Sequence, residues 1–238
     1  MPRANLFDHL PQLGGSTPQG TVARVKVGHL RPTQNAVGMD EVNAKVARLG
    51  KRSDSSLQAY LLPRTIPVVI GNGGHPHLID HHHLARSVLM AEGDIDVPVE
   101  VVRNWAPLSD GHFWKAMARE HWVYPFAPDG GGPIPVSQMC KHLDQLGNDI
   151  HRSVSWVART NYAYVKTDDN AIFTEFKWAN FFRTHLLLSQ LLEWPGDVSA
   201  VTLADLRTAD PDALEDARKR GLYLARSPEA STLPGYAG

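Results

Sequence analysis

The chain has 238 residues, 42% of them hydrophobic and 21% charged, which is typical of one large globular domain or two small ones. A formal net charge of -1 gives no electrostatic reason to expect tight binding to bulk nucleic acid, although a local basic patch stays compatible with this composition. Cys140 is the single cysteine, which excludes an intrachain disulfide and a cysteine-based zinc site.

Strand patterns fall mainly before residue 105. Residues 1–20 contain Gly and Pro without periodicity and are expected to form a flexible arm. Thr21–Val27 alternates apolar and polar residues, which predicts a half-buried strand. Val97–Val102 is a second strand-like run, and Pro98 within it indicates an edge strand or the start of a strand.

Two helices are expected between these strands. Met39–Leu49 carries apolar residues at helical spacing with charged residues between them. Ser53 or Asp54 can cap a second, short helix over Ser55–Leu62, which ends at Pro63.

The stretch Ile66–Glu92 has the highest density of candidate functional side chains, because five of the 12 histidines lie within nine positions. Pro67–Ile70 predicts a buried strand, Gly71–Gly74 a hairpin turn and His77–Ile79 the return strand. Apolar residues at helical spacing follow. His81–His83 therefore lies where a strand gives way to a helix, a place where unpaired helical N–H groups can hold an anion.

Patterns after residue 105 are mainly helical. Helices are predicted over residues 113–121, 136–146, 152–159, 173–192 and, as one or two helices, 199–221. The glycine-rich stretch 125–135 is interpreted as a linker, with a lid as the alternative, and the tail from residue 227 as frayed. Strands early and helices late indicate an α+β fold.

Several of these segments resemble the ParB/sulfiredoxin superfamily: Arg31–Gln34, Val37–Val42, the strand–turn–strand and Asp80–His83. The ParB-like nuclease branch, whose loop reads Asp-Gly-His-His-Arg or a variant, is the most similar. The resemblance covers roughly residues 21–105, and later blocks resemble that branch's extension. It implies a small mixed sheet domain over 21–105, a mainly helical extension over 106–226 packed on it, and a tail over 227–238.

The resemblance implies an enzyme that handles a phosphoryl group, in nucleotide-dependent transfer or hydrolysis or in phosphodiester cleavage. His82 stands where sulfiredoxins keep a reactive cysteine, which excludes that chemistry. Leu84 stands where a phosphate-binding arginine is usual, and Arg86 could compensate.

These considerations assign roles to nine residues. His82 or His83 is expected to be the general acid or base, with Asp80 orienting the imidazole and Glu41 as a second carboxylate. The expected phosphate-binding or substrate-binding residues are Arg31, Gln34, Lys45, His81 and Arg86.

Other interpretations of the histidine run stay open. Alternate residues of a strand share a face, so Asp80, His81 and His83 could hold a divalent metal in an enzyme acting on a small molecule. The protein could instead be a non-enzymatic DNA- or protein-binding module, although the net charge does not support DNA. The run could also be a polar turn with exposed imidazoles. A nucleotide or a divalent metal is the implied cofactor, and a small molecule or nucleotide the implied ligand.

The helical extension offers further charged residues. Glu175 could face inward and form a buried structural ion pair with Arg152 or Arg159. Arg152, Lys166 and Glu175 could alternatively contribute to the site. Cys140 is expected to be buried on a helical face rather than reactive. No apolar run reaches the ~20 residues of a membrane helix, and a signal peptide core is lacking, so we expect a cytoplasmic protein without a membrane partner.

Overall fold

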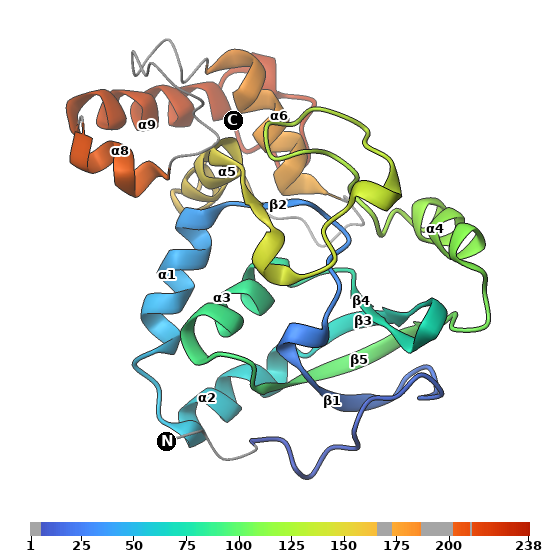
Figure 1. Ribbon diagram of the computed structural model, residues 1–238. Helices are drawn as coiled ribbons and strands as arrows, with labels where there is room; N and C mark the ends of the chain where they lie inside the picture. The colour runs from blue at the N-terminus through green and yellow to red at the C-terminus, as the bar shows by residue number, and fades with distance from the viewer. Residues whose placement is uncertain (1–5, 166–172, 187–201, 210) are drawn as a thin grey trace. The chain divides into compact units, whose positions relative to one another are not determined.

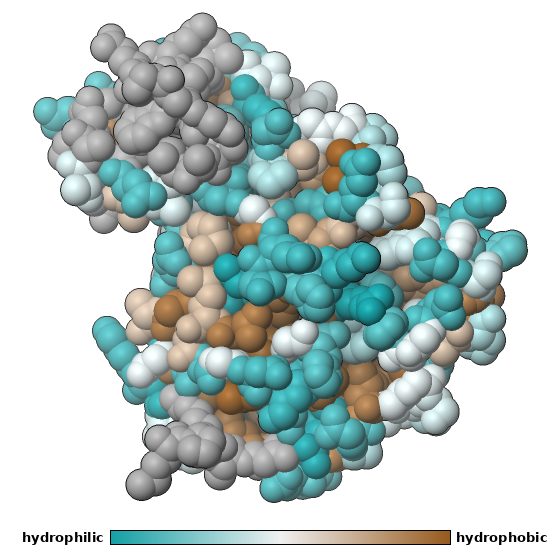
Figure 2. Space-filling model, viewed as in Figure 1, coloured by the Kyte–Doolittle hydropathy of each residue, from teal (hydrophilic) through white to brown (hydrophobic). Residues whose placement is uncertain are grey.

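A computed structural model describes residues 6–165, 173–186, 202–209 and 211–238 (Figure 1). The chain divides into two compact units. The first contains the described residues up to Asn35, with Val42–Ala127 and Gly132–Leu146. The second contains Ala36–Glu41, Pro128–Gly131 and the described residues from Gly147 onward. The face drawn in Figure 2 carries hydrophilic side chains with hydrophobic ones between them. None of the described helices combines the length and the hydropathy that a membrane crossing requires.

A four-stranded mixed sheet lies at the centre of the first unit (Figure 1). Its strands are β1 (Val22–Lys26), β3 (Ile66–Ile70), β4 (Pro76–Leu78) and β5 (Asp96–Asn104), in the order β1-β5-β3-β4. β5 pairs antiparallel with β1 and parallel with β3, and β3 pairs antiparallel with β4 as the predicted hairpin. The mixed sheet and its helices confirm the α+β class.

β5 is an inner strand, so the edge position predicted from Pro98 is wrong. Pro98 lies opposite Arg24 of β1, and pairing with β3 begins one residue later, where Val99 lies opposite Ile66. The missing N–H of proline is tolerated there because Pro98 precedes the β3 pairing. Its position near the beginning of β5 agrees with the alternative prediction of a strand start.

Four helices belong wholly or mainly to the first unit: α1 (Met39–Leu49), α2 (Asp54–Leu61), α3 (His82–Glu92) and α4 (Asp110–Arg119). Ser53 is the N-cap of α2, and its side chain accepts a hydrogen bond from the Ser56 N–H. α3 begins within the histidine run, as the sequence predicts. α4 packs through Phe113 and Met117 in a cluster that includes Val69 of β3.

Residues 6–20 contact β1 more closely than a flexible arm would. The Phe7 side chain is buried. The Arg24 N–H donates to the Pro11 carbonyl, and the Leu13 N–H donates to the Arg24 carbonyl, each at 2.9 Å. The Arg24 guanidinium also donates to the Leu10 carbonyl at 3.2 Å. These contacts, which no periodicity indicates, attach the segment to the sheet.

The helix predicted over residues 136–146 is wrong, because the segment forms two single 3-10 turns, Val136–Gln138 and Leu143–Gln145. The Gln145 side-chain oxygen accepts from the backbone N–H groups of Lys141 and His142, which closes a loop in place of a helical turn. Cys140 therefore does not lie on a helix. It is half-buried, and burial raises the pKa of its thiol.

The second unit is mainly helical. β2 (Ala36–Val37) and β6 (Gly147–Asn148) form a short parallel pair. The helices are α5 (Ile150–Thr160), α6 (Thr174–His185), α8 (Leu203–Ala209) and α9 (Pro211–Ala225). The core of the unit contains Trp178, which stacks on the Tyr164 ring with centroids 4.3 Å apart. Residues 187–192 of the predicted long helix lie outside the described residues.

The tail after α9 packs within the second unit. Pro228–Ala230 forms a 3-10 turn in which Ala230 is buried. The Trp178 indole N–H donates to the Pro234 carbonyl at 2.8 Å, and Tyr236 pairs with Tyr164 in an isolated bridge. The frayed tail predicted from the sequence is therefore wrong, because these contacts are long-range and leave no local pattern.

Candidate functional site

Two segments that the sequence singles out lie side by side in the first unit. The Arg31 N–H donates to the Pro76 carbonyl at 2.9 Å, and the Leu78 N–H donates to the Arg31 carbonyl at 3.0 Å. Two residues further, the Thr33 N–H donates to Nε2 of His82 at 3.1 Å, while the Thr33 hydroxyl donates to the Leu78 carbonyl at 2.9 Å. The loop that follows β1 is thus attached both to β4 and to the start of α3.

His82 holds this junction. Its side chain is buried, and burial lowers its pKa to about 3, an effect that the nearby Asp80 carboxylate opposes. Because Nε2 accepts from a backbone N–H, the ring is neutral with its proton on Nδ1. A general acid or base works best with a pKa near the working pH. The geometry therefore suits His82 to positioning the loop better than to proton transfer.

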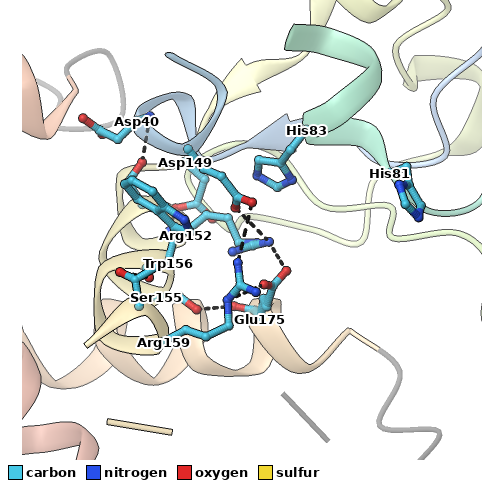
Figure 3. Close-up of polar contacts among 12 residues, drawn as sticks. Asp40, His81, His83, Asp149, Arg152, Ser155, Trp156, Arg159 and Glu175 are labelled. Carbon is cyan, nitrogen blue, oxygen red and sulfur yellow. Dashed lines mark hydrogen bonds and ion pairs between the residues drawn. The ribbon is translucent and has the colours of Figure 1, made fainter. Parts of the chain in front are cut away.

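His81 and His83 have a different environment. Both side chains are half-buried, and Figure 3 shows their imidazoles pointing in different directions from the start of α3. His81 adopts a left-handed conformation with φ of 64° at the N-cap of the helix. The Asp80 carboxylate accepts from the His81 N–H at 2.6 Å. Asp80 thus holds the backbone of the turn.

The predicted metal ligands do not converge. Among the residues that the structure describes, no group of three or more His, Cys, Asp or Glu side chains is placed to hold a metal ion. The set Asp80, His81 and His83 is therefore not assembled, because the left-handed turn at His81 ends the alternation on which that expectation depends.

Arg31 gives the first unit a positive charge beside the β4 hairpin. Burial lowers its pKa, against the attraction of Asp110. The same guanidinium contributes, after burial, to lowering the pKa of His75 and of His77. The pKa of His77 is about 4, and its ring packs on Phe113 at a centroid distance of 4.7 Å. His77 is therefore a neutral core residue, and Arg31 supplies positive charge beside the β4 hairpin.

The remaining predicted residues of this unit have distinct positions. Gln34 is buried and forms a parallel bridge with Tyr124. Leu84 is buried in the core, as expected for an apolar residue on this helix. Arg86 lies one turn into α3, and its Nε is buried without a hydrogen-bond partner among the described residues. Lys45 is half-buried on α1.

Glu41 lies in a charge network of the second unit. Its carboxylate is 4.0 Å from Arg152 and 3.6 Å from Arg159. Glu175 forms a hydrogen-bonded ion pair with Arg152 and lies 3.1 Å from Arg159 (Figure 3). The predicted pairing of Glu175 with these arginines is confirmed. Lys166, the other candidate of the extension, lies outside the described residues.

The network is electrically balanced and largely buried. Arg152 is 2% exposed and Glu41 6% exposed, and two carboxylates face two guanidinium groups. Buried charges are tolerated when they are paired in this way. The arrangement therefore supports a structural role for Glu41, and its role as a second catalytic carboxylate stays a prediction.

Sequence reasoning missed Asp149, which organises the start of α5. Its carboxylate accepts from the N–H groups of His151 and Arg152 at 3.0 and 3.2 Å and pairs with Arg183 at 2.6 Å. Burial alone would raise its pKa, but hydrogen bonding to His151 and the Arg183 charge hold the pKa below its usual value. An Asp directly before a helical pattern is the signal that could have revealed this cap.

Comparison with known proteins agrees with this architecture. A sequence model of the family described as "Putative ParB-like nuclease" matches residues 23–184, more than half of the chain. Among solved structures, protein Atu1540 from Agrobacterium tumefaciens is similar with a TM-score of 0.73 and 29% sequence identity. That similarity covers 91% of this chain and 96% of the other. No curated protein gives a match.

Proposed function

Because this chain belongs to the putative ParB-like nuclease family, we propose that it hydrolyses phosphodiester bonds at the start of α3. The observation that carries the proposal is the hydrogen bond from the Thr33 N–H to His82, 3.1 Å long. It joins the Arg31–Gln34 loop to the histidine run, so two segments expected to contact phosphate lie together in one unit.

The start of α3 offers an anion-binding position. The side chain of His81, the N-cap residue, makes no capping hydrogen bond. The first N–H groups of a helix lack intrahelical acceptors, and the helix dipole adds partial positive charge there. A phosphodiester is an anion of suitable charge for this position.

Two arginines supply further positive charge in this proposal. Arg31 lies beside the β4 hairpin that leads into the turn. Arg86 follows His82 by one helical turn, and long side chains in helices lean toward the N-terminus. Its buried Nε has no hydrogen-bond partner among the residues that the structure describes, and in this proposal the Arg86 guanidinium turns toward a phosphate oxygen. Arg86 would thus compensate for the buried Leu84, which stands where the superfamily has its arginine.

His83 is the proposed general acid or base. It is half-buried, whereas His82 is buried and hydrogen-bonded to the loop. His83 would take a proton from the attacking water or give one to the leaving oxygen, while His82 positions the turn. Such proton transfer contributes typically 10²- to 10⁴-fold to a rate.

A hydrolysis assay with a charge variant tests the proposal. Purified protein without a histidine tag is incubated with labelled single-stranded DNA, duplex DNA and RNA, and products are measured over time. The wild type is expected to cleave at least one substrate. Arg31→Met should raise KM about tenfold, because one charged hydrogen bond to phosphate is lost.

Arg119→Met is the matched control, because the Arg119 side chain is 75% exposed on α4. It should leave KM unchanged. A wild-type protein that cleaves none of these phosphodiesters contradicts the proposed function.

A further inference from the structure

Two aromatic residues flank the candidate site. The Tyr124 N–H donates to the Thr33 carbonyl at 2.8 Å, so Tyr124 lies directly beside the residue that contacts His82. The Asn35 side chain donates to the Phe126 carbonyl at 3.2 Å. The two rings lie with centroids 4.6 Å apart at 39°. The loop that anchors the histidine run thus also fixes an aromatic pair.

The aromatic pair is partly exposed. Tyr124 and Phe126 are half-buried, and neither is a member of the cluster that contains Trp178 or of the cluster that contains Phe113. The neighbouring tryptophans, by contrast, pack against one of these clusters. Phe126 is supported by Gly132, where an added Cβ would lie 3.1 Å from the ring. The pair is held firmly yet remains partly open to solvent.

We propose that Tyr124 and Phe126 stack an unpaired base of a single-stranded nucleic acid whose scissile phosphodiester lies at the start of α3. This inference rests on the proposed function and names its substrate class. Tyr124 and Gln34 pair as neighbouring strands do, about 4.8 Å apart, which places the Tyr124 backbone beside the Arg31–Gln34 loop.

The overall charge favours a single strand over a duplex. A formal net charge of -1 provides little of the counterion release that drives binding to duplex backbone. Stacking of bases on aromatic rings provides affinity that does not depend on net charge, and only unpaired bases offer a free face. In this proposal, base stacking adds binding affinity to that provided by the phosphate contacts of Arg31 and Arg86.

Removing either the ring or the base tests the inference. Binding of a fluorescein-labelled strand of about twelve thymidines is measured by anisotropy, beside an abasic strand of equal length and a duplex. The wild type should bind the thymidine strand about tenfold more tightly than the abasic strand. Tyr124→Leu should abolish this difference and bind both strands as the wild type binds the abasic one, and Tyr124→Phe should retain it.

Tyr223→Leu is the control, because Tyr223 is 73% exposed on α9. It should bind both strands as the wild type does. If Tyr124→Leu does not fold, the wild-type comparison of thymidine and abasic strands still decides the question. Equal wild-type affinity for the two strands overturns the inference, as does a folded Tyr124→Leu variant that keeps the difference. Cleavage of duplex with no preference for single strands would overturn it while leaving the proposed function intact, whereas no cleavage of any phosphodiester would overturn the function.

Discussion

Three consecutive histidines have unequal environments, although the sequence presents them as equivalent. His82 is buried and accepts a hydrogen bond from Thr33, while His81 and His83 are half-buried. A left-handed residue at the N-cap produces this difference, because it ends the alternation of the strand before the helix begins. Residue identity alone could not reveal which ring faces the core.

Replacing His82 should mainly affect stability. His82→Ala removes the acceptor of the buried Thr33 N–H, which costs about 1–3 kcal/mol in free energy of unfolding. Urea unfolding followed by tryptophan fluorescence measures the change, with His29→Ala, an exposed histidine, as the control. A His82→Ala variant of wild-type stability but without activity would return His82 to a catalytic role.

At the scale of elements, most strands and helices could be predicted. The alternation in β1, the apolar run of β3 and the spacing in α1 are local signals, and local signals survive in one sequence. The segment 136–146 could not be predicted, because the side chain of Gln145 satisfies backbone donors that a helix would otherwise satisfy. The domain boundaries at residues 20, 105 and 226 stay a prediction.

The segments that form the candidate site could be predicted from the sequence, but the contacts that bring them together could not. The density of histidines indicates the run, and the family resemblance indicates Arg31. The hydrogen bond from the Thr33 N–H to His82 joins these two segments, which are separated in sequence, and no periodicity indicates it.

The start of α5 gives a prediction at this scale. Asp149→Ala removes both the helix cap and the partner of Arg183, so unfolding free energy should fall by about 3 kcal/mol. Asp149→Asn keeps an oxygen that can cap the helix and should cost less. Thermal and urea unfolding measure both variants. Equal losses for the two would contradict the combined role of cap and ion pair.

At the scale of the whole molecule, buried histidines make stability depend on pH. The pKa of His82 is about 3 and that of His77 about 4, and both are lower than the unfolded value near 6.5. Below pH 6.5 the unfolded chain therefore binds more protons than the folded chain, and stability decreases as pH falls. The contribution of these rings is fully present above pH 6.5.

Unfolding free energy should therefore decrease between pH 6.5 and 4, by on the order of 3 kcal/mol from His77 alone. Urea titrations at several pH values measure it. The slope should become smaller in a His77→Phe variant, which keeps an aromatic ring beside Phe113. An unchanged slope in that variant would contradict the assignment.

The family match and the composition together identify a globular protein of the putative ParB-like nuclease family. Its proposed hydrolytic chemistry depends on the turn at the start of α3. The family match covers residues 23–184, which includes the whole histidine run. Hydrolysis at the start of α3 is the central proposal, and it separates two adjacent histidines by role. In this proposal His83 transfers the proton, whereas His82 holds the loop through its hydrogen bond with Thr33.

Single-turnover cleavage by His83→Ala tests this claim most directly. Tag-free wild type, His83→Ala and the control His29→Ala are mixed in excess with the best labelled single-stranded substrate, and their melting temperatures are compared. We predict a rate lower by about 10²- to 10⁴-fold for His83→Ala, with a melting temperature close to that of the wild type. A folded His83→Ala protein that cleaves at the wild-type rate would contradict the account.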